Sequence, residues 1–153
     1  MGYQLQPIGT VVGGRTEAID DEWGEVEADV LLDEGTVDKD ATVGLDEFSH
    51  VEVVYLFHQV DAGGVTTGTR HPRGNHDWPE VGILAQRGKS RPNRLGVSVC
   101  ELLAVDGLQL RVRGLDAIDG TPVLDVKPYI VEFSPRGPIW QPAWASELMR
   151  SYW

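Results

Sequence analysis

The stretch from Phe48 to Val60, FSHVEVVYLFHQV, carries the strongest β-strand signal in this chain of 153 residues. β-Branched and aromatic residues dominate it, and such residues pack well on a pleated surface. Its central Val-Val-Tyr-Leu-Phe leaves little room for a polar face, so we expect this strand to be covered on both sides. Asp61-Ala-Gly-Gly follows and ends the strand.

Two further strands are predicted on the N-terminal side. The segment Tyr3–Val12 is rich in β-formers and has no helical periodicity, and Pro7 within it indicates a sheet edge or a bulge. The segment Glu25–Leu32 alternates apolar and acidic residues, which is typical of a strand with one face in water. A short helical turn is predicted near Val43–Leu45.

The C-terminal side contains a predicted hairpin and a predicted helix. The apolar runs Leu95–Val105 and Leu108–Gly114 flank Asp106-Gly107, and Asp-Gly between two such runs is a hairpin signal. A short strand is predicted at Val81–Ala85. The segment Ala143–Tyr152 is the one predicted helix, because four of its large apolar or aromatic residues share a face: Trp144, Leu148, Met149 and Tyr152.

This order of elements predicts a mainly β fold. Many short strands with frequent turns and no βαβ alternation indicate a single antiparallel β-barrel or sandwich with a short C-terminal helix. The chain length is that of one domain, so we treat residues 1–153 as a single domain.

The composition of the chain argues against several classes of function. The formal net charge is −11, and an acidic surface repels phosphate backbones, which argues against general nucleic-acid binding. The lone Cys100 lies in an apolar run and is predicted to be a buried core thiol. No membrane span or signal peptide is visible, so we expect a cytoplasmic protein without a membrane partner.

Positive charge gathers in one irregular stretch, Arg70–Gly96. It holds six of the 13 Lys and Arg residues but only two carboxylates, Asp77 and Glu80. Such a local basic region in an acidic chain is where an anionic or polar ligand would bind. Because Arg87 and Asn93 can bind a carboxylate or a base edge, and Asp116 and Asp119 can accept from hydroxyls or amines, the combination suits a zwitterionic nucleoside.

Three other kinds of site are disfavoured. A metal site would rest on the four histidines, with His71 and His76 as a pair, but only one cysteine exists and no His-Glu-x-x-His motif occurs. Gly13-Gly14 and Gly63-Gly64 fit neither the P-loop nor the dinucleotide pattern. No Gly-x-Ser-x-Gly motif is present, so a serine nucleophile is not indicated.

Several longer motifs resemble those of one enzyme family. They are Phe48-Ser49-His50, Phe57-His58, VGILAQR ending at Arg87, Arg91-Pro92-Asn93 with Leu95-Gly96, and DGTPVLDVKPY from Asp119 to Tyr129. Together they look like the TrmO (TsaA-like) family of S-adenosylmethionine-dependent methyltransferases. The resemblance covers most of the chain, from Leu5 to Ile130.

The resemblance implies a fold, an activity and a set of residues. It implies a β-barrel and a homodimer that binds S-adenosyl-L-methionine close to the subunit interface. The family's activity is N6-methylation of threonylcarbamoyladenosine at position 37 of tRNA. The cofactor-binding residues carried over by the motifs are His58, Gln59, Arg87, Val97, Asp116, Ala117, Ile118 and Asp119.

One part of the family pattern is missing. The Pro-Arg-Gln element after the first strand is replaced by Asp20-Asp21-Glu22-Trp23. We expect Trp23 to contribute to the cofactor site instead, by packing on the adenine or near the sulfonium, because an aromatic face attracts a cation.

A second set of residues is predicted for the methyl acceptor, the molecule that would receive the methyl group. Arg70, Arg73, Arg91 and Asn93 are expected to bind the methyl acceptor. An adenine-type nitrogen is a poor nucleophile, so a proton acceptor nearby would help. The candidates for catalytic residues are His50, Asp125 and Tyr129; in the alternative interpretation, Asp125, Lys127 and Tyr129 only fix the conformation of the segment 121–130.

Three function classes remain open from the sequence. The first is a tRNA methyltransferase of the TrmO type, which the basic stretch favours. The second is a methyltransferase for a small molecule or another nucleoside, which the net charge of −11 and the lack of an added C-terminal domain favour. The third is a protein that binds S-adenosyl-L-methionine without catalysis.

Overall fold

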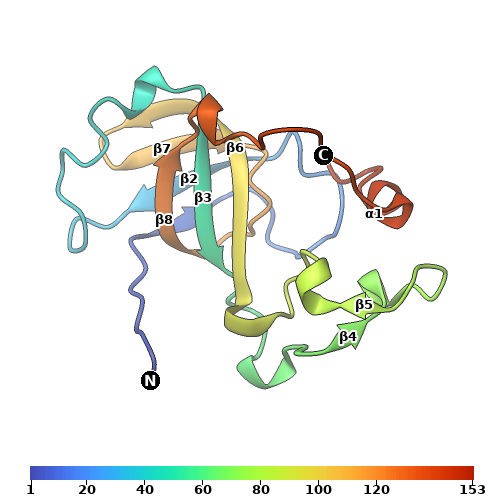
Figure 1. Cartoon of the computed structure of the whole chain (residues 1–153). Helices are drawn as coiled ribbons and strands as arrows, with labels where there is room; N and C mark the ends of the chain where they lie inside the picture. The colour runs from blue at the N-terminus through green and yellow to red at the C-terminus, as the bar shows by residue number, and fades with distance from the viewer.

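Six antiparallel strands close into a barrel in the computed structural model, which describes residues 1–153 (Figure 1). The neighbours around the barrel are β1-β2-β7-β6-β3-β8, and β8 pairs with β1 to close it. The strands are β1 (Gly9–Val12), β2 (Glu27–Leu32), β3 (His50–Leu56), β6 (Leu95–Asp106), β7 (Gln109–Arg113) and β8 (Pro122–Pro128). The prediction of a mainly β, antiparallel barrel is confirmed.

The strand β3 lies between β6 and β8 and supplies part of the core. Its side chains alternate, so that Val51, Val53 and Tyr55 are buried inside the barrel. The other residues of β3 point outward and are half-buried. The sequence predicted that both faces of this strand would be covered, and the structure covers only the inner face completely. The alternation arises because successive side chains of a strand point to opposite faces.

The N-terminal strand is shorter than its sequence predicts. Only Gly9–Val12 forms β1, because the residues before Ile8 have no neighbouring strand to pair with. Pro7 precedes the strand, and β1 has partners on both sides, so the predicted sheet edge is wrong. The helical turn expected near Val43–Leu45 is present slightly later, as a 3₁₀ turn at Leu45–Glu47.

The predicted hairpin joins β6 to β7. Asp106 pairs with Gln109, so the connecting residues are Gly107 and Leu108. Gly107 has a φ of 57°, and a positive φ at the first of two central residues is the position that favours glycine in tight hairpin turns. The Asp-Gly signal therefore identified the hairpin, with the glycine inside the turn and the aspartate at the strand end.

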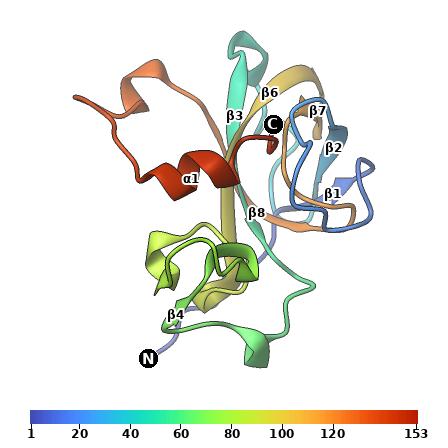
Figure 2. The ribbon, with the colours of Figure 1, turned by 90° about the vertical axis from the view of Figure 1, so that its right-hand side faces the viewer.

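Three segments outside the barrel surround one side of it (Figure 2). The arm, residues 57–94, contains the two-stranded sheet of β4 (Thr69–Arg70) and β5 (Val81–Gly82), and a 3₁₀ turn at Ile83–Ala85 replaces the rest of the strand predicted there. The strap, residues 141–153, contains α1 (Ala143–Leu148). The third segment is the loop of residues 13–26.

The helix α1 is shorter than predicted and has no buried residue. Trp144, Leu148, Met149 and Tyr152 are all half-buried on the side that faces the rest of the molecule, as the periodicity predicted. No helix in the structure has the length and apolar character that would let it cross a membrane.

The barrel interior is filled mainly by small and branched apolar side chains. Among them, Cys100 is buried, which confirms the predicted core thiol. Burial, with a further contribution from the charge of Asp116, raises the pKa of Cys100 to about 12. A thiol with this pKa stays protonated near neutrality and is a poor nucleophile.

Gly96 on β6 leaves room for the ring of Tyr55 on β3. Gly96 and Tyr55 are directly opposite each other on the paired strands β6 and β3. A Cβ at Gly96 would lie 2.5 Å from two ring atoms of Tyr55. Replacing Gly96 by any larger residue would therefore push Tyr55 out of its place.

We expect Gly96→Ala to lower the free energy of unfolding by about 1–3 kcal/mol, the usual cost of overpacking a tight core. The measurement is urea denaturation followed by tryptophan fluorescence. Gly82→Ala is the matched control, because a Cβ at Gly82 meets no atom within 4 Å and its φ is −59°. An equal effect of the two substitutions would contradict the proposed role of the Gly96–Tyr55 contact.

Candidate functional site

A large cleft lies where the barrel, the arm and the strap meet, with a volume of about 1870 Å³. Sites for small molecules usually have volumes of about 300–1,000 Å³, so this cleft has room for more than one ligand. Its floor is formed by β3, β6 and the segment 116–121, and the arm and the strap form its sides.

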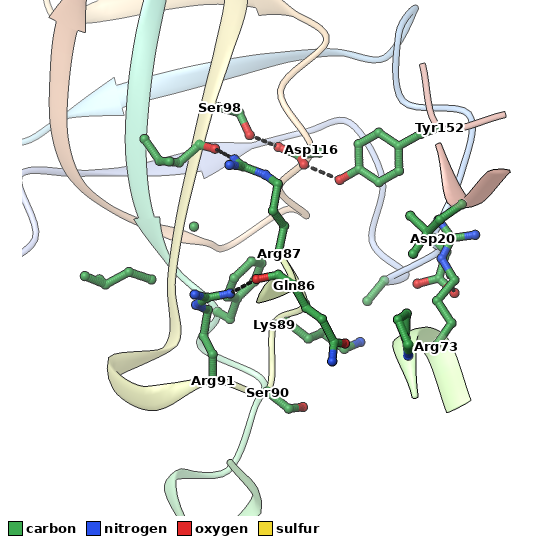
Figure 3. A pocket seen from close by; sticks show the side chains of 18 of the residues that line it. Asp20, Arg73, Gln86, Arg87, Lys89, Ser90, Arg91, Ser98, Asp116 and Tyr152 are labelled. Carbon is green, nitrogen blue, oxygen red and sulfur yellow. Dashed lines mark hydrogen bonds and ion pairs between the residues drawn. The ribbon is translucent and has the colours of Figure 1, made fainter. Parts of the chain in front are cut away.

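Asp116 stands at the floor of the cleft and accepts hydrogen bonds from three hydroxyl groups, and Figure 3 shows those from Ser98 and Tyr152. Its Oδ1 accepts from Tyr55 on β3, at 3.0 Å, and from Ser98 on β6. Its Oδ2 accepts from Tyr152 on the strap. The three donors come from distant parts of the chain and fix the orientation of the carboxylate.

The two tyrosines that contact Asp116 remain neutral donors. Burial, the largest cause, and the negative charge of Asp116 both raise the pKa of Tyr55 and of Tyr152 well above the ordinary value. Arg87 and Arg73 act in the opposite direction on Tyr152, but the pKa of Tyr152 is still raised. Because a protonated phenol can donate, both bonds to Asp116 persist throughout the neutral pH range.

Arg87 extends from the arm across the cleft toward β6 (Figure 3). Its Nη2 donates to the carbonyl of Val97 at 2.7 Å, and its side chain is otherwise exposed. The structure thus brings together the predicted residues Arg87, Val97 and Asp116 in one cleft. A guanidinium has five N–H donors, so Arg87 keeps several for a ligand.

Most other cations of the arm are used within the protein. Arg91 donates to the carbonyl of Gln86 at 2.6 Å, and Arg94 donates to the carbonyl of Val60 at 2.6 Å. Arg73 forms a bidentate salt bridge with Asp21, with N–O distances of 2.8 and 3.2 Å. Arg70, Arg73, Arg91 and Asn93 all line the cleft, but Arg73 is already neutralised by Asp21.

The predicted turn from Asp116 to Asp119 lies only partly in the cleft. Ala117 and Ile118 are buried and line the cleft. Asp119 lies outside the lining, where its Oδ1 accepts from the backbone N–H of Gly13 at 2.8 Å. The imidazole of His58 lies beside Gly120, and both His58 and Gln59 line the cleft.

Trp23 lines the cleft but is almost wholly buried, with 3% of its surface exposed. Its indole N–H donates to the carbonyl of Ile19 at 2.9 Å. The guanidinium of Arg15 lies 4.6 Å from the ring centroid, so one face of the ring already contacts a cation.

The three candidates for catalytic residues lie away from the cleft of their own chain. His50 contacts the hydroxyl of Ser49, Asp125 pairs with Lys127 at 3.0 Å, and Tyr129 contacts the hydroxyl of Ser134. None of the three lines the cleft. The structure also contains no group of three or more His, Cys, Asp or Glu side chains that could hold a metal ion.

Sequence reasoning missed the hydroxyl groups around Asp116. Ser98 occupies an inward position of β6, between the inward Gly96 and Cys100, and a polar residue at an inward position is a signal that could have been used. Tyr152 was predicted as part of an apolar helix face, which says nothing about the direction of its hydroxyl.

The comparisons with known proteins agree with this geometry. The sequence model of the tRNA-methyltransferase O N-terminal domain matches residues 21–134. A protein named tRNA (adenine(37)-N6)-methyltransferase from Escherichia coli is 42% identical over 97 residues, which are 60% of this chain and 40% of that protein. A probable S-adenosyl-L-methionine-binding protein from Pyrococcus abyssi is 36% identical over 122 residues, 80% of this chain and 60% of that protein.

Solved structures show the same fold. A crystal structure of TrmO from Pseudomonas aeruginosa superposes with a TM-score of 0.74 at 26% identity, over 94% of this chain and 62% of that one. The chain thus spans between 40% and 62% of the length of these relatives. With a family match over most of its length, the chain belongs to the family of the tRNA-methyltransferase O N-terminal domain.

Proposed function

We propose that the chain binds S-adenosyl-L-methionine in the cleft and transfers its methyl group to the N6 position of a modified adenosine at position 37 of tRNA. The observation that carries the proposal is the pairing of a fixed carboxylate, Asp116, with a guanidinium that has free donors, Arg87, in one cleft. The names of the relatives from E. coli and P. abyssi support it. A tRNA acceptor would place the protein in the cytoplasm.

The residues of the cleft fit this cofactor. The cofactor carries a carboxylate, an ammonium group and ribose hydroxyls. Arg87 has donors for the carboxylate, and Asp116 Oδ2, which accepts one hydrogen bond in the structure, can accept another. His58, Gln59, Val97, Ala117 and Ile118 supply further contacts on the same walls.

The protein's part in the reaction would be to position the two reactants. The cofactor, when bound, supplies a methyl group that its sulfonium already activates. Arg87 and Asp116 would hold the carboxylate and the ammonium group of the cofactor, and Arg70, Arg91 and Asn93 on the arm would orient the acceptor. Holding both reactants in line accounts for a large part of such a rate enhancement.

A second copy of the chain belongs to the proposal. His50, Asp125 and Tyr129 can act only if another subunit brings them to a cleft, since they lie outside their own. The segment 130–140 also exposes an unusual set of large apolar side chains, 38–85% accessible: Ile130, Val131, Phe133, Ile139 and Trp140. We propose that this segment contacts the partner in a homodimer, because exposed apolar clusters mark interaction sites.

A small-molecule or nucleoside acceptor is the second candidate. The net charge of −11 opposes binding of a large polyanion. Several cations of the arm are also already paired with protein groups, so they contribute less to binding phosphates. The third possibility is cofactor binding without turnover, in line with the name of the P. abyssi relative.

Incubation with methyl-labelled S-adenosyl-L-methionine separates these functions. We expect label in total tRNA, and none in tRNA that lacks the threonylcarbamoyl modification at adenosine 37. Label that persists in the unmodified tRNA would exclude the specific acceptor, whereas label only in a metabolite extract would favour a small molecule. Binding of S-adenosyl-L-methionine in calorimetry without any methyl transfer would show that the protein only binds the cofactor. Absence of cofactor binding would refute all three candidate functions.

We expect Arg87→Ala to weaken S-adenosyl-L-methionine binding by roughly tenfold or more, because a hydrogen bond to a charged group contributes about 1.5–3 kcal/mol. Arg87→Lys keeps the charge but loses the planar fork, so we expect a smaller loss. Titration calorimetry is the measurement. Lys39→Ala is the control, because Lys39 is exposed and lies outside both the cleft and the segment 130–140. Unchanged affinity in Arg87→Ala would show that Arg87 is only a surface cation.

We expect the double substitution Phe133→Glu and Trp140→Glu to convert a dimer into a monomer, because buried carboxylates at an apolar contact lose their hydration. Light scattering after size exclusion measures the mass. Val43→Glu is the control, since Val43 is 83% exposed and lies in a different loop. A wild-type chain that is monomeric at micromolar concentration would refute the proposed dimer.

A further inference from the structure

The arm, the strap and the loop of residues 13–26 are joined to one another in pairs around the cleft. The arm joins the loop through Arg73 and Asp21. The loop joins the strap through backbone hydrogen bonds, in which the N–H groups of Glu22 and Trp23 donate to the carbonyls of Ser151 and Tyr152 at 2.9 and 2.8 Å. The arm joins the strap through Trp78, whose indole N–H donates to Glu147 at 2.8 Å. The three connections form a ring around the cleft.

The connection between the loop and the strap is the tightest. Besides its two backbone hydrogen bonds, a Cβ at Gly24 would lie 2.8 Å from the backbone carbonyl carbon of Trp153, so the chains are in close contact there. Tyr152 adds its bond to Asp116. The end of the strap is thus held by backbone contacts and by a half-buried side chain.

The connection between the arm and the strap is the weakest. It is a single hydrogen bond between two side chains, and it is exposed to solvent. On the strap side it is carried by α1, a six-residue helix without a buried residue, and a helix this short has little stability of its own. Regions with few buried contacts and exposed hydrogen bonds open most readily, so the ring opens first between Trp78 and Glu147.

We propose that the Trp78–Glu147 hydrogen bond is a gate that controls how fast ligands enter and leave the cleft, with Tyr152 and the end of the strap as its hinge. The inference rests on the proposed function for the ligand, S-adenosyl-L-methionine. When the bond breaks, α1 can swing away from the arm while the backbone contacts at residues 151 and 152 hold the end of the strap. Trp78 and Glu147 are then positioning residues and do not react.

A gate has a kinetic signature that an ordinary contact lacks. Opening it removes the same barrier from entry and from exit, so the association and dissociation rates rise together and their ratio changes little. A contact that only stabilises the bound state would raise the dissociation rate alone and weaken the affinity. The two interpretations therefore differ in the association rate.

The test is stopped-flow binding of S-adenosyl-L-methionine followed by tryptophan fluorescence, with Trp23 and Trp144 on the walls of the cleft as reporters. We expect Glu147→Ala to raise both rates by about two- to tenfold, the range that one net hydrogen bond supports, with less than a threefold change in Kd. Glu147→Gln keeps an acceptor oxygen and should restore most of the slow exchange. Glu34→Ala, an equal loss of charge at an exposed position elsewhere, should leave both rates unchanged.

Two results would overturn the gate. Rates in Glu147→Ala equal to those of the wild type, or a faster dissociation with an unchanged association rate, would show that the bond does not limit exchange. Absence of any binding by the wild type is a different failure, because it would refute the proposed function and the gate with it. Binding by the wild type with unaltered kinetics in Glu147→Ala would refute the gate alone.

Discussion

The carboxylate of Asp116 is the point on which the arrangement of the cleft depends. It accepts hydrogen bonds from Tyr55 on β3, Ser98 on β6 and Tyr152 on the strap. Two of these donors belong to the barrel and one does not, so the carboxylate joins a rigid body to a segment that has no core of its own. A half-buried carboxylate without these donors would be costly, because buried polar groups need partners. The bond from Tyr152 to this carboxylate, together with the backbone hydrogen bonds at residues 151 and 152, thus holds the end of the strap over the cleft.

The basic stretch serves the protein's own structure as much as any ligand. The arm has only two short strands, so many of its backbone carbonyls lack the partners that a sheet or a helix would provide. The guanidinium groups of Arg91 and Arg94 donate to such carbonyls, and Arg73 holds the arm against the loop of residues 13–26. Arg87 differs because its side chain is exposed and bonds to a single carbonyl.

The sequence predicted the barrel strands better than their ends, and it predicted residues that line the cleft better than the hydrogen bonds that hold them there. Alternation in Glu25–Leu32 and the apolar run around Val54 reflect which side chains are buried, and this is a local property. The end of the first strand depends on whether a neighbour is within reach, which the residues before Ile8 do not reveal. The family motifs named Arg87, Val97 and Asp116, which the structure brings together in one cleft, whereas the bond from Tyr152 depends on the path of the strap and has no local signal.

The closure of β1 on β8 has a consequence for how the protein behaves at high concentration. Closure pairs most of the backbone of the barrel strands on both sides, and an unpaired edge is the usual template for uncontrolled association between chains. The edges of β4 and β5 have two residues each, and two longer stretches, residues 95–100 of β6 and 124–128 of β8, pair only with β3. Pairing with a foreign strand is therefore confined to these short stretches, and the rest of the barrel can associate with other chains only through its side chains.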